Sequence, residues 1–365
     1  MKRKALTFGE SNVSIITAFA GSIAGATIIA GLVMIANAFN GGSFAESTDF
    51  AYITLALTQL LMFGGAFFYL AVLRKVNVFN LFRMGFGKLS LVKVLLLFAI
   101  AVGAILLFAP LAELFVGALM KLGYQPIIEE AESFTWGGLV IAIAAMCILP
   151  AFNEEILFRG ILMNGARRKG AYFAIVYTAF IFMIFHGNPQ QTVHQFFLGL
   201  IFGYLAVTTG SIIFGVILHF FNNLIAVLFG YISFDGITSD GLIIMYAVWV
   251  VAGAVILFFA LRAFKRLNDR EKFGDTETKP NGIKDSVVYI KKLLFDKSFR
   301  LTEKEAFNNK YDAQNEFGGE IDPDVIFAAG TGEEKKYPTS AKVAIIGGIL
   351  MWLLTCIMGF LGALS

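Results

Sequence analysis

Ionisable side chains that can take part in hydrolysis lie inside the most apolar part of this sequence. The stretch PAFNEEILFRG places Glu154, Glu155 and Arg159 directly after the apolar run WGGLVIAIAAMCIL. His186 and His219 follow in FIFMIFHGN and LHFFNNL, which are equally apolar. A charged side chain at the middle of a membrane helix costs roughly 2.5–3.5 kcal/mol, so such residues usually serve a function. A carboxylate near an imidazole can activate water as a general base.

The spacing of these residues predicts that a carboxylate meets an imidazole. Gly170 lies midway between Glu154 and His186, so an antiparallel helix pair that turns at this glycine brings both side chains to one depth. Phe182 precedes His186 by one helical turn and is expected to place an aromatic ring beside the imidazole. Pro150 interrupts the helical hydrogen bonds before Glu154, and we expect a kink there that lets water approach.

Helical spacing also predicts different roles for the two carboxylates. Glu155 and Arg159 form an i,i+4 pair in the favourable order, so Glu155 is predicted to be the structural partner of Arg159. Glu154 is then the free carboxylate. His219 and Asn223 share the same i,i+4 spacing and are expected on one face of a later helix, from which they can reach the same cavity.

Two further polar residues allow more than one interpretation. His194 follows His186 across the loop NPQQ, and it either adds a ligand or lies at the membrane interface, which we favour. Asn222 is about 100° away from Asn223 around the helix and is expected to face elsewhere.

The composition identifies a membrane protein, because 58% of the residues are hydrophobic and only 15% are charged. We therefore predict an all-α, polytopic membrane protein with about nine transmembrane helices, each formed by an apolar run long enough to cross a bilayer or close to it. The predicted spans are residues 13–39, 51–73, 91–118, 137–158, 171–187, 193–209, 211–232, 242–264 and 341–364. The formal net charge of +3 is too small to indicate nucleic acid binding.

Basic clusters predict the orientation, since loops rich in Lys and Arg stay in the cytoplasm. If every segment crosses once, the clusters at residues 2–4, 74–75, 167–169 and 265–266 all lie on one side of the cell membrane. The loops that carry only acidic charge fall on the other side. We therefore expect a cytoplasmic N-terminus and an external C-terminus.

The pattern of apolar and polar segments divides the chain into five parts. They are N-terminal membrane helices with an interfacial segment at 76–90 (1–135), a core of four helices (136–232), an additional membrane helix (233–264), a polar cytoplasmic segment (265–340) and a C-terminal membrane helix (341–365).

The polar residues of the core occur in an ordered set of motifs: Glu-Glu-x-x-x-Arg at 154–159, Phe-x-x-x-His at 182–186 and His-x-x-x-Asn at 219–223. This set, on successive membrane helices, resembles the CPBP family, which contains CAAX proteases and bacteriocin-processing enzymes and is also called the Abi family. The surrounding sequence resembles the bacterial branch more than the eukaryotic type II CAAX prenyl proteases. The likeness covers about residues 136–232, which would form the catalytic core.

The resemblance implies an intramembrane endopeptidase. By this likeness, Glu154 and His186 would activate water, while His219 and Asn223 would stabilise the tetrahedral oxyanion. Glu155 and Arg159 would belong to the structural part of the first motif, with Phe182 supporting the site. A zinc ion held by Glu154, His186 and His219 and a metal-free mechanism are both left open.

The expected partners are a protein or peptide substrate and the membrane lipids, with no nucleic acid. The substrate could be prenylated or a bacteriocin-like precursor, as in the family. Two other classes of function are kept as alternatives. One is a membrane scaffold or immunity protein without catalysis. The other, which we favour less, is a transporter that relays protons through buried Glu and His.

Overall fold

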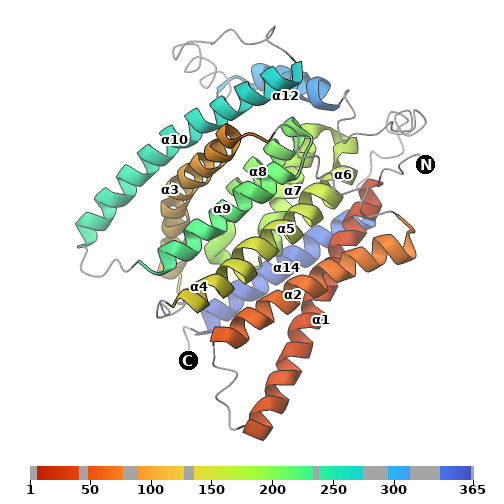
Figure 1. Cartoon of the computed structure of the whole chain (residues 1–365), viewed down its shortest axis with the longest axis vertical. Helices are drawn as coiled ribbons and strands as arrows, with labels where there is room; N and C mark the ends of the chain where they lie inside the picture. Colours follow the sequence, from red (N-terminus) through yellow and green to blue (C-terminus); the bar gives the residue numbers. More distant parts are fainter. Residues whose placement is uncertain are drawn as a thin grey trace.

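Helices form all the regular structure that can be described in this protein. The computed structural model describes residues 6–40, 48–76, 89–126, 135–232, 238–273, 295–312 and 338–362, and these ranges contain no strand. Figure 1 shows tilted helices, with α10 and α3 at one edge, α1 and α2 at the other, and α5 between them. The prediction of an all-α polytopic membrane protein is confirmed.

The long helices match the predicted spans. Their bounds are α1 Phe8–Asn40, α2 Thr48–Phe68, α3 Leu91–Lys121, α7 Ala171–Phe185, α8 Thr192–Thr209, α9 Ile213–Gly230, α10 Ser239–Phe273 and α14 Thr339–Gly362. The remaining span, Trp136–Lys169, is built from the consecutive segments α4 Trp136–Ala142, η3 Ile143–Ile148, α5 Leu149–Glu155, η4 Ile156–Leu162, α6 Met163–Ala166 and η5 Arg167–Lys169. A polar helix, α12, covers Lys297–Asp312.

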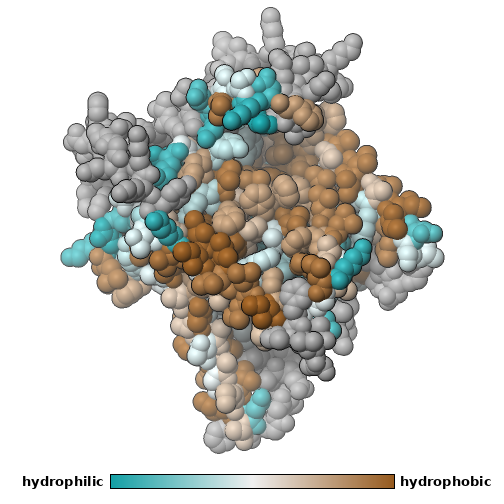
Figure 2. Space-filling view, turned by 180° about the vertical axis from the view of Figure 1, so that it is seen from behind, coloured by the Kyte–Doolittle hydropathy of each residue, from teal (hydrophilic) through white to brown (hydrophobic). Residues whose placement is uncertain are grey.

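By length and composition, eight helices in the described ranges can cross a membrane. The fifth predicted span, 171–187, is the apolar helix α7, which is shorter than the others. The surface of the protein agrees with a lipid environment, because apolar side chains dominate the middle of the face that Figure 2 shows. Exposed examples include Leu32, Leu95 and Val251.

The basic clusters that the described ranges contain lie near one another. Arg74 forms an ion pair with Glu10 at the start of α1, and Arg168 donates a hydrogen bond of 2.9 Å to the carbonyl of Leu6. Helix α10 ends at the same end of the molecule as α12 in Figure 1. This arrangement agrees with single crossings, while the assignment of this side to the cytoplasm stays a prediction. Residues 2–4 lie outside the described ranges.

Two predicted non-spanning segments are only partly covered. The interfacial segment at 76–90 lies almost wholly outside the described residues, since 77–88 are not described. Within 265–340, helix α10 continues past residue 264 to Phe273, and α12 follows, while 274–294 and 313–337 are not described. The division into five parts stays a prediction.

Glycines make the two turns that position the core. Gly170 ends the fourth span with φ 99°, and Gly210 ends α8 with φ 71°, in the left-handed region that side chains with a Cβ avoid. Gly199 of α8 lies so close to α7 that an added Cβ would be 2.9 Å from the Cα of Ala179. The helices of the core therefore turn sharply and pack at short distance.

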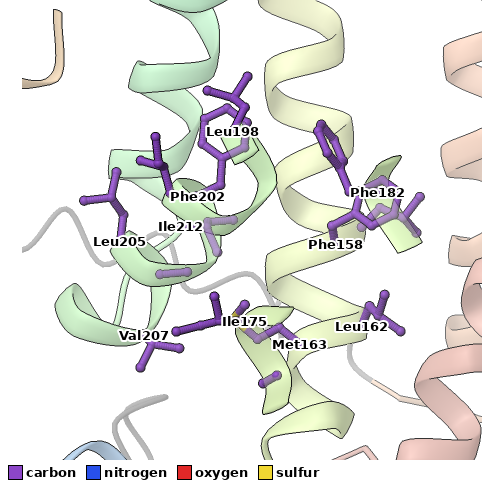
Figure 3. Packing of buried hydrophobic residues seen from close by; sticks show 14 of the residues in the cluster. Phe158, Leu162, Met163, Ile175, Phe182, Leu198, Phe202, Leu205, Val207 and Ile212 are labelled. Atoms are coloured by element: carbon purple, nitrogen blue, oxygen red, sulfur yellow. The ribbon is translucent and has the colours of Figure 1, made fainter. Parts of the chain in front are cut away.

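The interior around these helices is aromatic and aliphatic. Figure 3 shows Phe158 of η4 beside Phe182 of α7, with Leu198 and Phe202 of α8 opposite them. The ring centroids of Phe158 and Phe182 are 5.1 Å apart, and those of Phe182 and Phe202 are 6.1 Å apart. All of these side chains are fully buried. Polar groups inside this core must therefore find partners within the protein.

Candidate active site

The helix that carries both carboxylates departs from α-helical winding on either side of them. The segments η3 and η4 are π-helical, and α5 with Glu154 and Glu155 lies between them. Such segments in α-helices are frequent at functional sites. Pro150 has no amide hydrogen, so it cannot donate a hydrogen bond within this helix. The side chain of Asn223 donates to the carbonyl of Met146, in the π-helical segment before Pro150, at 2.9 Å. This bond attaches α9 to the helix that carries Glu154.

Glu154 lies where the predicted site residues meet. Its Oε1 accepts a hydrogen bond of 3.0 Å from Nε2 of Gln59 on α2. Its Oε2 has no hydrogen-bond donor among the described residues and lies 3.9 Å from Nε2 of both His186 and His219. Glu154 is only 8% exposed. A carboxylate oxygen therefore faces two imidazoles from two other helices in a buried place.

The Nδ1 nitrogen of each imidazole lies next to a hydrogen-bond acceptor. Nδ1 of His186 lies 2.8 Å from the carbonyl oxygen of Phe182, which can only accept, so this nitrogen carries the hydrogen. Nδ1 of His219 lies 3.3 Å from Oε1 of Glu155. These contacts orient both rings and leave both Nε2 atoms facing Glu154.

Glu155 and Arg159 form the predicted ion pair. Nη1 of Arg159 donates to Oε1 of Glu155 at 2.7 Å, Nη2 donates to the carbonyl of Gly199 at 3.1 Å, and both charged side chains are fully buried. The guanidinium lies 4.6 Å from the ring centroid of Phe182 and 4.8 Å from that of Phe202. Glu155 thus connects the arginine to His219, a contact that the sequence did not predict.

Aromatic rings enclose the imidazoles. The ring centroid of Phe182 is 4.6 Å from that of His186 and 6.0 Å from that of His219. Phe202 stacks on His219 with centroids 4.9 Å apart. The expected aromatic ring beside His186 is therefore present, and it contacts both histidines.

A chain of polar side chains lies next to this cluster. Nε2 of His194 is 3.2 Å from Oδ1 of Asn222, and Nδ2 of Asn222 donates to Oδ1 of Asn223 at 3.2 Å. Asn222 is 3% exposed, and its side chain lies between those of His194 and Asn223. The hydrogen bonds of Asn223 lead to Met146 and Asn222 and not to Glu154.

The structure thus joins three of the predicted residues directly and adds others. Glu154, His186 and His219 converge, and Asn223 lies in the neighbouring polar chain. Gln59 was missed, although a lone Gln within the apolar run LALTQLLMF is the kind of intramembrane polar residue that indicates a site.

The residues do not form a ready zinc site. No group of three His, Cys, Asp or Glu side chains that could hold a metal ion occurs in the part of the chain that the structure describes. With Glu154 Oε2 3.9 Å from each Nε2, a zinc ion bonded at about 2.0–2.1 Å would require ligand angles of roughly 140°, far from tetrahedral.

Together these features define a multi-pass membrane protein with a carboxylate and two imidazoles buried in its helical core. Residues 136–225, which include every residue of the three motifs, match the family model described as type II CAAX prenyl endopeptidase Rce1-like. This match confirms the resemblance to the CAAX protease family and implies a protease that acts on a peptide or protein. No curated protein and no solved structure matches the chain.

Proposed function

We propose that the protein is an intramembrane endopeptidase in which Glu154 activates water for peptide hydrolysis. One observation carries this proposal: Oε2 of Glu154 has no donor among the described residues and lies 3.9 Å from Nε2 of both His186 and His219. A buried acceptor in this position can take a proton from a water molecule bound next to it, and the imidazole of His186 faces the same carboxylate oxygen. The family match of the same segment supports a protease.

In the proposed reaction, Glu154 removes a proton from water while the water oxygen attacks the carbonyl carbon of the scissile bond. The carbonyl oxygen becomes the oxyanion of a tetrahedral intermediate. Glu154 then returns the proton to the leaving nitrogen, and the carbon–nitrogen bond breaks. The products are a carboxylic acid and an amine, so the proton is conserved.

His219 and Asn223 are the proposed donors to the oxyanion. His219 contacts both carboxylates through its two ring nitrogens, and its Nε2 donates to the oxyanion when this nitrogen carries a hydrogen. Asn223 uses one amide hydrogen for Met146 and retains a second. Donors of this kind typically contribute about 10²–10³-fold in rate.

We propose a metal-free, glutamate-dependent mechanism rather than a zinc mechanism. The wide separation of the carboxylate oxygen from both imidazole nitrogens supports this choice. The two mechanisms differ in a simple test. The metal-free mechanism predicts that purified protein cleaves its substrate after extensive treatment with a chelator and without stoichiometric zinc by mass spectrometry. Activity that is lost with the chelator and returns with Zn²⁺ would favour the zinc mechanism.

The proposed substrate is a membrane-associated peptide that ends in a prenylated Cys-aliphatic-aliphatic-X sequence, with a bacteriocin-like precursor as the second choice. Glu154 lies within the fourth span, which ends at the basic residues Arg167, Arg168 and Lys169. If this basic end is cytoplasmic, as the positive residues predict, the substrate approaches from the cytoplasm and the N-terminus lies on the same side. We place the protein in the cell membrane and in the bacterial branch of the family.

The proposal is tested with purified protein in detergent and a quenched fluorescent peptide with a farnesylated C-terminal motif. Cleavage by the wild type that is absent in Glu154→Gln supports the proposal. Cleavage that persists in Glu154→Gln would exclude Glu154 as the base. A wild type that cleaves none of a set of prenylated and unprenylated peptides would favour the scaffold function.

A further inference from the structure

Helix α2 contributes a polar side chain to the site from outside the segment that matches the family. Gln59 is 9% exposed, and its Nε2 donates to Oε1 of Glu154 at 3.0 Å. The amide of Asn153, next to Glu154, donates in turn to the backbone carbonyl of Gln59 at 3.4 Å. Two hydrogen bonds therefore connect α2 to the catalytic helix at this level.

The position of Gln59 is fixed by close packing of α1 and α2. An added Cβ at Gly21 of α1 would collide with the carbonyl oxygen of Leu61, and one at Gly65 of α2 would collide with that of Thr17. The backbones of the two helices are thus in contact at Leu61 and at Gly65, both within the two helical turns that follow Gln59 along α2. A side chain on such an element is held more precisely than one on a loop.

Two buried acceptors at this contact have no donor within the described part of the protein. They are Oε1 of Gln59 and Oε2 of Glu154. A buried polar atom left without a partner costs about 1–3 kcal/mol, so both atoms favour an additional donor. A single water molecule has two O–H groups, so one water bound between the two atoms would donate to both. No described side chain performs this task.

We propose that Gln59 is a further catalytic residue, whose Oε1 accepts a hydrogen bond from the attacking water while the other hydrogen of that water points to Glu154 Oε2. The role of this water in hydrolysis rests on the proposed function, whereas the water site itself does not. Gln59 has two tasks. Its nitrogen holds Oε1 of Glu154, and its oxygen orients the nucleophile.

The arrangement leaves the water ready to react. With both hydrogens directed to protein oxygens, a lone pair of the water oxygen is free to attack the substrate carbonyl. Glu154 takes one hydrogen as the oxygen–carbon bond forms, and the other hydrogen stays on the new hydroxyl group and remains bonded to Gln59. Orientation of this kind lowers the barrier without changing how the substrate binds.

The first test compares Gln59→Leu and Gln59→Asn with a matched control on the same helix. Leucine has a similar size and no polar atoms, and asparagine retains the carboxamide but is too short to reach both partners. Thr54→Val is the control, because Thr54 Oγ1 is another buried atom of α2 without a partner in the described ranges. On the farnesylated peptide, kcat is expected to fall about 10²-fold in Gln59→Leu, with KM unchanged, and to remain at the wild-type value in Thr54→Val.

The second test is independent of the substrate. An experimental structure of the wild-type protein at high resolution should show an ordered water within about 3 Å of both Gln59 Oε1 and Glu154 Oε2, and Gln59→Leu should lack it. This water in a protein that cleaves no peptide would support the water site and contradict the proposed function. The role of Gln59 would be overturned if the structure showed no water at this position. It would also be overturned if Gln59→Leu or Gln59→Asn kept the wild-type kcat, or if Thr54→Val lost as much kcat as Gln59→Leu.

Discussion

Arg159 is buried at the centre of the site and offers the clearest test of how its charges are balanced. Its guanidinium contacts Glu155 at 2.7 Å and the carbonyl of Gly199 at 3.1 Å, with no exposed surface on either charged side chain. We consider Arg159→Met, which retains the apolar length of the side chain and removes the charge. Glu155 then keeps a buried charge without its cation.

The expected cost is large. Breaking a buried ion pair by removal of one partner destabilises a protein by about 3–5 kcal/mol, since the remaining charge stays buried. This free energy corresponds to an increase of roughly 10²–10⁴-fold in the ratio of unfolded to folded protein. Arg159→Met should therefore reduce the yield of folded protein strongly, while the rings of Phe182 and Phe202 still lie around the side chain.

The assay is size-exclusion chromatography after a series of heating steps in detergent, which gives the folded fraction against temperature. The matched control is the double variant Glu155→Gln/Arg159→Met, in which two neutral side chains replace the buried ion pair and His219 keeps an oxygen acceptor at position 155. This double variant should recover most of the folded fraction. The reasoning would be refuted if Arg159→Met melted like the wild type. It would also be refuted if the double variant kept no more folded protein on heating than Arg159→Met.

The remaining predictions concern catalysis and packing. Glu154→Ala, His186→Ala and His219→Ala should each abolish cleavage of the farnesylated peptide while the protein remains inserted and elutes as a folded species. Cleavage that survives His186→Ala would exclude it as an aid to water activation. Gly215→Ala on α9 should lower the melting temperature, because an added Cβ would lie 2.5 Å from Oε2 of Glu155; a melting temperature equal to that of the wild type would show that the carboxylate moves freely.

Regular helix geometry explains which parts of the site could be predicted from the sequence. The meeting of Glu154 with His186 required only a constant rise per residue and a turn at Gly170, which has the positive φ that glycine permits. The pairing of Glu155 with Arg159 required only i,i+4 spacing. The apolar runs were equally informative, because a bilayer sets the length of a span.

Contacts between helices that are distant in the sequence could not be predicted in the same way. The bond between Gln59 and Glu154 depends on how α2 packs against α5, and no spacing in the sequence encodes that packing. The contact between Asn222 and His194 has a related cause, since a rotation of about 100° around α9 removes a side chain from one neighbour and brings it to another. The π-helical segments beside the carboxylates also lack a clear sequence signal, apart from Pro150.

The central claim is that Glu154 activates water for the cleavage of a membrane-associated protein. Its most direct test is mass spectrometry of membrane proteins from cells that express either the wild type or Glu154→Gln at equal levels. The account predicts new protein termini at specific sites that occur only with the wild type. Identical sets of termini in the two samples, with both proteins folded and inserted, would contradict it.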